Sequence, residues 1–150
     1  MGLKFSLQNV LDIRHGKVEL LEIDLGKLIT ALQKTEMLLQ SLKEHQAELV
    51  EQLSQAQSGD IDLFKMGMLR MNILDVSKHI VVVTAELEKQ TIEVKKKRAE
   101  LVEAKQAEET LEILKRKRYE VYMTEQVQIE SREQDDIYIA QAFRNQRKEA

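Results

Sequence analysis

The fold is decided by residues 28–62, which read LITALQKTEMLLQSLKEHQAELVEQLSQAQSGDID. Between Leu28 and Leu53 a row of eight positions is spaced at steps that alternate between four and three residues, and six of the eight are leucine. Such steps place side chains in a single row along one side of a helix, which is the contact seam of a coiled coil. The stretch therefore predicts a long helix that packs against another helix.

The last six residues of this stretch, QSGDID, interrupt the seam. Gly59 suits the positive φ at which many helices end. Asp60 or Asp62 can cap a following helix, because an aspartate oxygen accepts backbone N–H bonds from its first turn. Two long helices joined by a short connection become antiparallel neighbours. A helical hairpin with its turn at about residues 58–61 is therefore expected.

The same spacing extends over the whole first helix, expected at about residues 4–57. Twelve of its fifteen seam positions are apolar, compared with 43% of the whole chain. The apolar positions are Leu7, Leu11, Val18, Leu21, Leu25, Leu28, Leu32, Leu39, Leu42, Leu49, Leu53 and Ala56. The three polar positions, Arg14, Thr35 and Gln46, weaken a seam but fix its register.

A matching seam runs along a second helix, expected at about residues 62–145. It consists of Leu69, Ile73, Val76, Ile80, Val83, Leu87, Gln90, Val94, Lys97, Leu101 and Ala104. After Ala104 a three-residue step is repeated, which locally overwinds a coiled coil. The seam then continues through Ala107, Leu111, Leu114, Arg118 and Val121.

Pairing the two seams around the turn predicts which residues meet. Gln46 is expected opposite Ile73, and Leu11 near Glu108. Arg14 lies one layer from Glu108, so we expect an ion pair between them at the end of the seam.

Composition agrees with this architecture. The chain has 150 residues, no proline and only 4% aromatic residues, while 33% of its residues are charged. Proline breaks helix interiors, and its absence permits very long helices. Few aromatics and many charges are typical of a coiled coil rather than a globular core. We therefore predict an all-α fold: residues 1–150 form one long antiparallel two-helix coiled coil with an overhanging C-terminal helix.

Several classes of function are disfavoured by the sequence. The formal net charge of −3 argues against nucleic acid as a partner, and no apolar run is long enough to insert in a membrane. Without cysteine, and with isolated histidines, there is no recognised metal-ligand set. No phosphate-binding glycine-rich loop and no Ser/His/Asp set can be singled out. We therefore expect no enzyme activity, no catalytic residue, no cofactor and no metal.

The second helix extends beyond the end of the first. Residues 115–150 have no partner within the hairpin and, as a helix, would extend for roughly 50 Å. This overhang begins with a basic collar, Lys115 to Arg118, followed by six acidic residues and one arginine between Glu120 and Asp136. It also carries apolar residues: Tyr119, Val121, Tyr122, Val127, Ile129, Ile137, Tyr138, Ile139 and Phe143. A lone helix that exposes this much apolar surface is typical of a partner-binding segment, the alternative being a frayed tail.

Three stretches of the chain carry further motifs. Residues 5–14 read FSLQNVLDIR, residues 98–122 read RAELVEAKQAEETLEILKRKRYEVY, and residues 131–143 read SREQDDIYIAQAF. On these stretches the whole chain resembles the flagellar export protein FliJ family. The first is similar to that family's opening F-x-L-x-x-V-L-x-x-R, and the second to its R-x-x-L-x-x-A…L-x-x-L-K-x-R-R region. The third resembles its closing D-E-x-x-x-x-x-F, with Asp135 and Asp136 in place of Asp-Glu and six residues rather than five before Phe143.

The resemblance implies a component of the flagellar type III protein export apparatus. Family members resemble the central stalk of rotary ATP synthases and sit in the hexameric export ATPase, at the cytoplasmic side of the flagellar base on the inner membrane. It implies that one end of this chain enters the ATPase ring and promotes its assembly and activity. The residues implied are Phe5, Leu7, Leu11, Arg14, Leu111, Leu114, Arg118, Asp135, Asp136 and Phe143.

The resemblance also implies a contact with the cytoplasmic linker of the membrane export-gate protein, and export chaperones are further candidate partners. The gate contact would fall on Asn72, Val76, His79 and Val83, although the family pattern has a bulky apolar residue at the first position and a small one at the third. Two alternatives stay open on the sequence alone. One is a generic coiled-coil adaptor or spacer, and the other is the stalk of an injectisome or a rotary ATPase.

Overall fold

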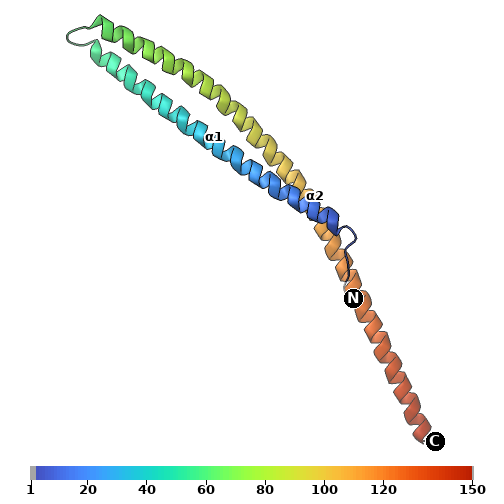
Figure 1. The fold of residues 1–150 in the computed structure, drawn as a ribbon. Helices are drawn as coiled ribbons and strands as arrows, with labels where there is room; N and C mark the ends of the chain where they lie inside the picture. The colour runs from blue at the N-terminus through green and yellow to red at the C-terminus, as the bar shows by residue number, and fades with distance from the viewer. Residues whose placement is uncertain (1–2, 150) are drawn as a thin grey trace. The chain divides into compact units, whose positions relative to one another are not determined.

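The computed structural model describes residues 3–149, so residues 1, 2 and 150 of the expected hairpin lie outside it. Two helices account for most of the described chain: α1, Gln8–Ala56, and α2, Leu63–Glu149 (Figure 1). They pack antiparallel as a hairpin coiled coil, which confirms the predicted all-α fold. α1 begins at Gln8 rather than near residue 4, and α2 reaches Glu149 rather than about residue 145.

The turn between the helices uses Gly59 and, of the two aspartates that could cap the second helix, Asp62. Gly59 takes a positive φ of 81°, a conformation that costs other residues free energy because of their Cβ atom. Asp62 is the cap of α2: its Oδ1 accepts the backbone N–H of Phe64 at 3.0 Å and of Lys65 at 3.2 Å. Capping these amides satisfies donors that the first turn of a helix would otherwise leave unpaired.

The predicted seams are the buried surface of the molecule. All fifteen seam positions from Leu7 to Ala56, and all eleven of α2 from Leu69 to Ala104, are buried or half-buried. The most buried side chains are Leu11, Val18, Leu21, Leu39, Leu49, Leu69, Val83, Val94, Ala104 and Leu111. Each fully buried Leu or Val contributes roughly 1.5–3 kcal/mol, so the hairpin depends on many similar layers rather than on one central core.

The chain divides into two compact units, and the division follows the seam. One unit is residues 19–103, which hold the turn and most of the hairpin. The other, here called the terminal unit, joins the chain up to Val18 with the part of α2 from Ala104 onward. The boundary in α2 falls at Ala104, where the sequence repeats a three-residue step.

A polar layer interrupts the apolar seam inside the unit of residues 19–103. Gln46 Nε2 donates a 2.8 Å hydrogen bond to Ser77 Oγ, which lies one helical turn beyond Ile73, the neighbour expected for Gln46. The Ser77 hydroxyl in turn donates to the Ile73 carbonyl at 2.7 Å. Because only one register brings the amide to this hydroxyl, the layer favours that alignment of the helices over its neighbours.

Neither helix has, within the described residues, a stretch of the length and apolar character that crossing a bilayer requires.

Replacing Asp62 with alanine should lower the free energy of unfolding by about 1 kcal/mol, because two amides of the first turn of α2 lose their acceptor. Urea unfolding followed by helical circular dichroism measures this loss. Asp60→Ala is the matched control, since no cap bond involves that carboxylate, and its effect should stay within about 0.5 kcal/mol. Equal losses in both variants would contradict the assignment of Asp62 as the cap.

A double-mutant cycle between Gln46→Ala and Ser77→Ala should show a coupling energy of about 0.5–1.5 kcal/mol, the range of a net hydrogen bond. The same cycle between Gln46 and Thr91, roughly 20 Å further along α2 than Ser77, should be additive. Additivity in both cycles would show that the two helices are not held in this register in solution.

Candidate functional site

The N-terminal segment, residues 3–7, is not helical and lies against α2. The backbone N–H of Gln8 donates to the Phe5 carbonyl at 3.0 Å, which closes a turn at the start of α1. The first bond of the helix runs from Leu11 N–H to the Leu7 carbonyl at 2.9 Å. Leucine has no side-chain acceptor for helix amides, so the beginning of α1 lacks a side-chain cap at this position.

Ser6, the obvious capping residue nearby, is used differently. Its Oγ accepts a 2.9 Å hydrogen bond from Arg118 Nη1 of α2. The Arg118 guanidinium also lies over the Phe5 ring, 5.4 Å from its centroid. A cation–π contact at an exposed site contributes about 0.5–1 kcal/mol. Arg118 therefore attaches the segment to α2 by two contacts, and we call this arrangement the N-terminal clasp.

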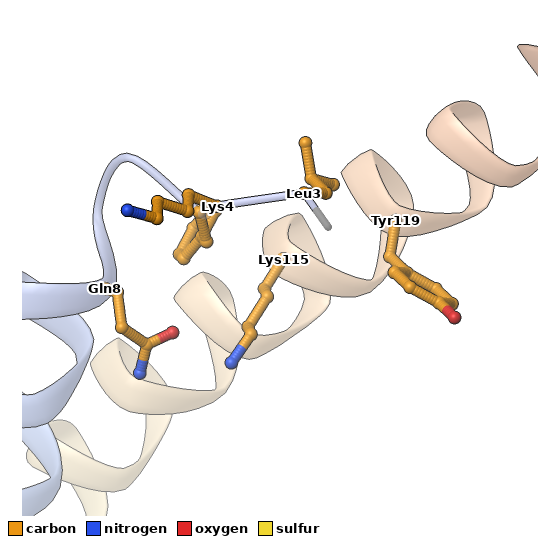
Figure 2. Close-up of a pocket in the computed structure, with 6 residues that line it drawn as sticks. Leu3, Lys4, Gln8, Lys115 and Tyr119 are labelled. Carbon is orange, nitrogen blue, oxygen red and sulfur yellow. The ribbon is translucent and has the colours of Figure 1, made fainter. Parts of the chain in front are cut away.

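The clasp leaves a surface hollow of about 370 Å³ between the segment and α2. Figure 2 shows Leu3 and Lys4 on the segment that crosses α2, with Lys115 and Tyr119 projecting from the helix beneath it. Phe5 and Gln8 complete its lining. A second hollow, of about 340 Å³, lies beside Leu3 and is lined by α2 residues from Lys117 to Glu125.

The seam of the terminal unit ends in polar contacts that differ from those expected. Arg14 does not pair with Glu108: its Nη1 donates to the Ala107 carbonyl at 2.8 Å. Glu108 instead contacts His15, with 2.6 Å between Oε1 and Nδ1. The prediction of an Arg14–Glu108 pair was wrong because the small side chain of Ala107 leaves the backbone open to the arginine. His15, about 100° further around α1, reaches the outer edge where Glu108 lies.

The residues implied for ATPase binding fall into two groups. Seven of them, from Phe5 to Arg14 and from Leu111 to Arg118, lie where the first residues of the chain meet α2. Within this group Leu11 and Leu111 are buried against the opposite helix, so they support the site rather than offer surface. The other three, Asp135, Asp136 and Phe143, are exposed on α2, the last about 37 Å beyond Arg118 along the helix.

Beyond Leu114 α2 has no partner helix in the described part of the terminal unit, and only the N-terminal segment, residues 3–7, contacts it there. Arg118 and Val121 continue the seam spacing but are exposed, which agrees with the expectation that residues 115–150 have no partner within the hairpin. The physical reason is that α1 begins at Gln8 and the clasp replaces its next turn. Between residues 123 and 148 only Gln126 is even half-buried. Apart from the half-buried Tyr122, the apolar residues of this overhang, including Ile137, Tyr138 and Ile139, are open to solvent.

The residues implied for gate binding lie in the other unit, on α2. Val83 is buried in the seam and Val76 is half-buried there, whereas Asn72 and His79 are exposed. Any partner on this face therefore contacts Asn72 and His79 first.

Sequence reasoning missed Leu3, Lys4, Ser6, Gln8, Lys115 and Tyr119 as parts of one site. It expected a helix from residue 4, and a helix would not fold back over α2. The only available signal was Ser6, a preferred capping residue placed one position too early for the helix that follows.

Comparison with known proteins assigns the chain to a family. Residues 3–148 match the family described as flagellar FliJ protein, which is nearly the whole chain. No individual curated protein and no solved structure matches it significantly. The matched span contains all three motif stretches described above, residues 5–14, 98–122 and 131–143. The chain therefore belongs to the flagellar FliJ family, whose members are non-enzymatic components of the flagellar protein export apparatus.

Proposed function

We propose that this chain is the stalk of the hexameric flagellar export ATPase, and that its C-terminal overhang inserts in the centre of the ring. There it promotes ring assembly and nucleotide turnover without contributing a catalytic residue. It acts on the cytoplasmic side of the flagellar base, peripheral to the inner membrane. Family membership supports a place in the export apparatus, and the overhang supports the insertion.

The observation that carries the proposal is the distribution of apolar residues around the overhang. They include three pairs two residues apart: Tyr119 with Val121, Val127 with Ile129, and Ile137 with Ile139. All six side chains are about half exposed or more, from 46% for Ile129 to 64% for Ile139. Two residues along a helix are separated by about 200°, so each pair presents apolar groups on nearly opposite sides.

This distribution favours a partner that surrounds the helix. A helix that docks in a groove needs only one apolar stripe, whereas a helix that is apolar on several sides is normally buried on all of them. A ring of subunits with a central hole provides such an environment. Acidic residues between the pairs, among them Asp135 and Asp136, keep the isolated helix soluble. They also offer charges that a lining of opposite sign would orient.

A stalk in this position acts by contact rather than by chemistry. One asymmetric helix inside a ring of six similar subunits cannot touch all of them alike. The subunit interfaces that it favours are stabilised relative to the others, and a ligand shifts an equilibrium only by such differential binding. Nucleotide turnover then responds to how the overhang contacts the ring.

We also propose that the unit of residues 19–103 links the ATPase to the export gate and to export chaperones. The exposed pair Asn72 and His79 would make the gate contact, with the buried Val83 holding their helix against α1.

Truncation after Arg118 should abolish stimulation of a purified hexameric export ATPase while leaving the hairpin folded, because the overhang makes no seam contacts. Steady-state ATP hydrolysis and ring assembly by light scattering measure the effect. Ile137→Gln and Ile139→Gln should each reduce stimulation several-fold, since a surrounding partner contacts both sides of the helix. Val102→Gln, at an exposed apolar site outside the overhang, is the control and should retain full stimulation.

The outcomes separate the alternatives. Loss in only one of the two isoleucine variants would indicate a one-sided groove instead of a ring. Full activity of the truncated chain, together with self-association of the intact one, would leave a generic coiled-coil adaptor.

Replacing His79 and Asn72 together with alanine should weaken binding to the cytoplasmic linker of the gate protein without changing ATPase stimulation. Truncating a central contact residue typically costs 1–2 kcal/mol, or about five- to thirtyfold in affinity. Fluorescence anisotropy with a linker peptide measures it. Lys78→Ala, exposed beside His79 on the same helix, is the control, and equal affinity of all variants would remove these residues from the gate contact.

A further inference from the structure

The N-terminal clasp marks the level of the terminal unit at which α2 changes from one helix of a pair to a lone helix. A single helix with its side chains is about 10–12 Å across, and two packed helices need roughly twice that width. A ring whose central hole admits only the single helix of the overhang therefore cannot pass beyond the clasp. Residues 3–7 and the basic collar, Lys115 to Arg118, lie at this step in thickness.

Exposed cations gather at this step. All four residues of the basic collar are exposed, and so is Lys4 on the segment. Among the described residues none of the collar side chains forms an ion pair with a carboxylate. Arg118 is bound to the Ser6 hydroxyl and the Phe5 ring. Five exposed cations at this step attract an anionic partner, and Glu112 and Glu120, within four residues of the collar on α2, offset only part of their charge.

The hollow at the clasp combines these cations with apolar surface. Leu3, Phe5 and Tyr119 provide its apolar lining, and the ammonium-bearing side chains of Lys4 and Lys115 come from its two sides (Figure 2). Such a hollow fits a short loop with one apolar side chain flanked by carboxylates. The apolar group can fill the hollow while lysines and the collar contact the acids around it.

We infer that the clasp and the basic collar form a seat for an acidic loop at the mouth of the ATPase ring, and that this contact fixes how far the overhang inserts. The inference rests on the proposed stalk function, and it adds which surface of the ring contacts the stalk at the clasp. Opposite charges steer the two surfaces together during association and exclude deeper or shallower registers, in which collar and loop do not meet.

Charge reversal tests the seat. In the full-length chain, Lys4→Glu with Lys115→Glu should weaken binding to the purified hexameric export ATPase at least about tenfold at low salt. The matched control is Lys95→Glu with Lys96→Glu, which makes the same charge change at exposed positions outside the terminal unit. Binding of the wild type should weaken steeply with salt, and the difference between wild type and the Lys4/Lys115 variant should shrink as screening increases.

Photo-crosslinking identifies the loop directly. With p-benzoylphenylalanine in place of Tyr119, ultraviolet light should join the chain to a ring segment that contains several Asp or Glu residues around an apolar one. Mass spectrometry of the crosslinked product identifies that segment of the ring. A crosslink to a basic or uncharged segment, or equal binding by the Lys4/Lys115 and Lys95/Lys96 variants, would overturn the inference.

The overhang variants distinguish this failure from failure of the stalk function. If Ile137→Gln and Ile139→Gln each reduce stimulation several-fold while the Lys4/Lys115 variant binds normally, the overhang inserts without an acidic seat. If neither set of variants has an effect, both the seat and the stalk function are wrong.

Discussion

Mutual burial of two apolar seams is the constraint on which the rest of this protein depends. Neither helix can keep its row of leucines and valines out of water alone, and each row is too narrow to build a globular core. The helices therefore stay together only where both seams are present. Gly59 and Asp62 make the tight reversal that aligns them, and Gln46 with Ser77 selects one register from several that apolar contacts alone would allow.

The same constraint explains what happens where α1 is used up. Beyond Leu114 no seam residue of α1 remains, so α2 continues as a single exposed helix. The chain does not stop abruptly at that point. Ser6 does not cap α1. Its hydroxyl accepts a hydrogen bond from Arg118, whose guanidinium also lies over the Phe5 ring. The result is an end that combines a fixed N-terminal segment, a cationic rim and a helix with apolar groups on several sides.

An exposed apolar helix is a liability for an isolated protein, since it invites association with any other apolar surface. Interspersed carboxylates reduce that liability, and they also make the overhang electrostatically distinct from the basic collar next to it. Thickness, charge and apolar surface thus all change within a few residues of Arg118. In the proposed stalk, the ring recognises the protein by these changes in thickness, charge and apolar surface, and none of them requires a reactive group. A family of non-enzymatic export components fits such a design.

The sequence by itself determined the architecture, because heptad spacing, the absence of proline and the Ser-Gly-Asp break are local signals with few structural alternatives. It also determined that the C-terminal quarter exposes apolar side chains, since counting along the two seams shows that the second helix continues past the end of the first. Tertiary structure decided what the seam's end looks like. The pairing of His15 rather than Arg14 with Glu108, and the clasp of Phe5 and Ser6 on Arg118, depend on which side chains face each other across two helices. Heptad spacing gives the side of a helix on which a residue lies. Adjacent residues such as Arg14 and His15 differ by about 100° around the helix, however, and that difference decides which partner each one meets. The partner of Arg14 depends on the space that a small residue such as Ala107 leaves beside the backbone, and this space exists only once the helices have packed.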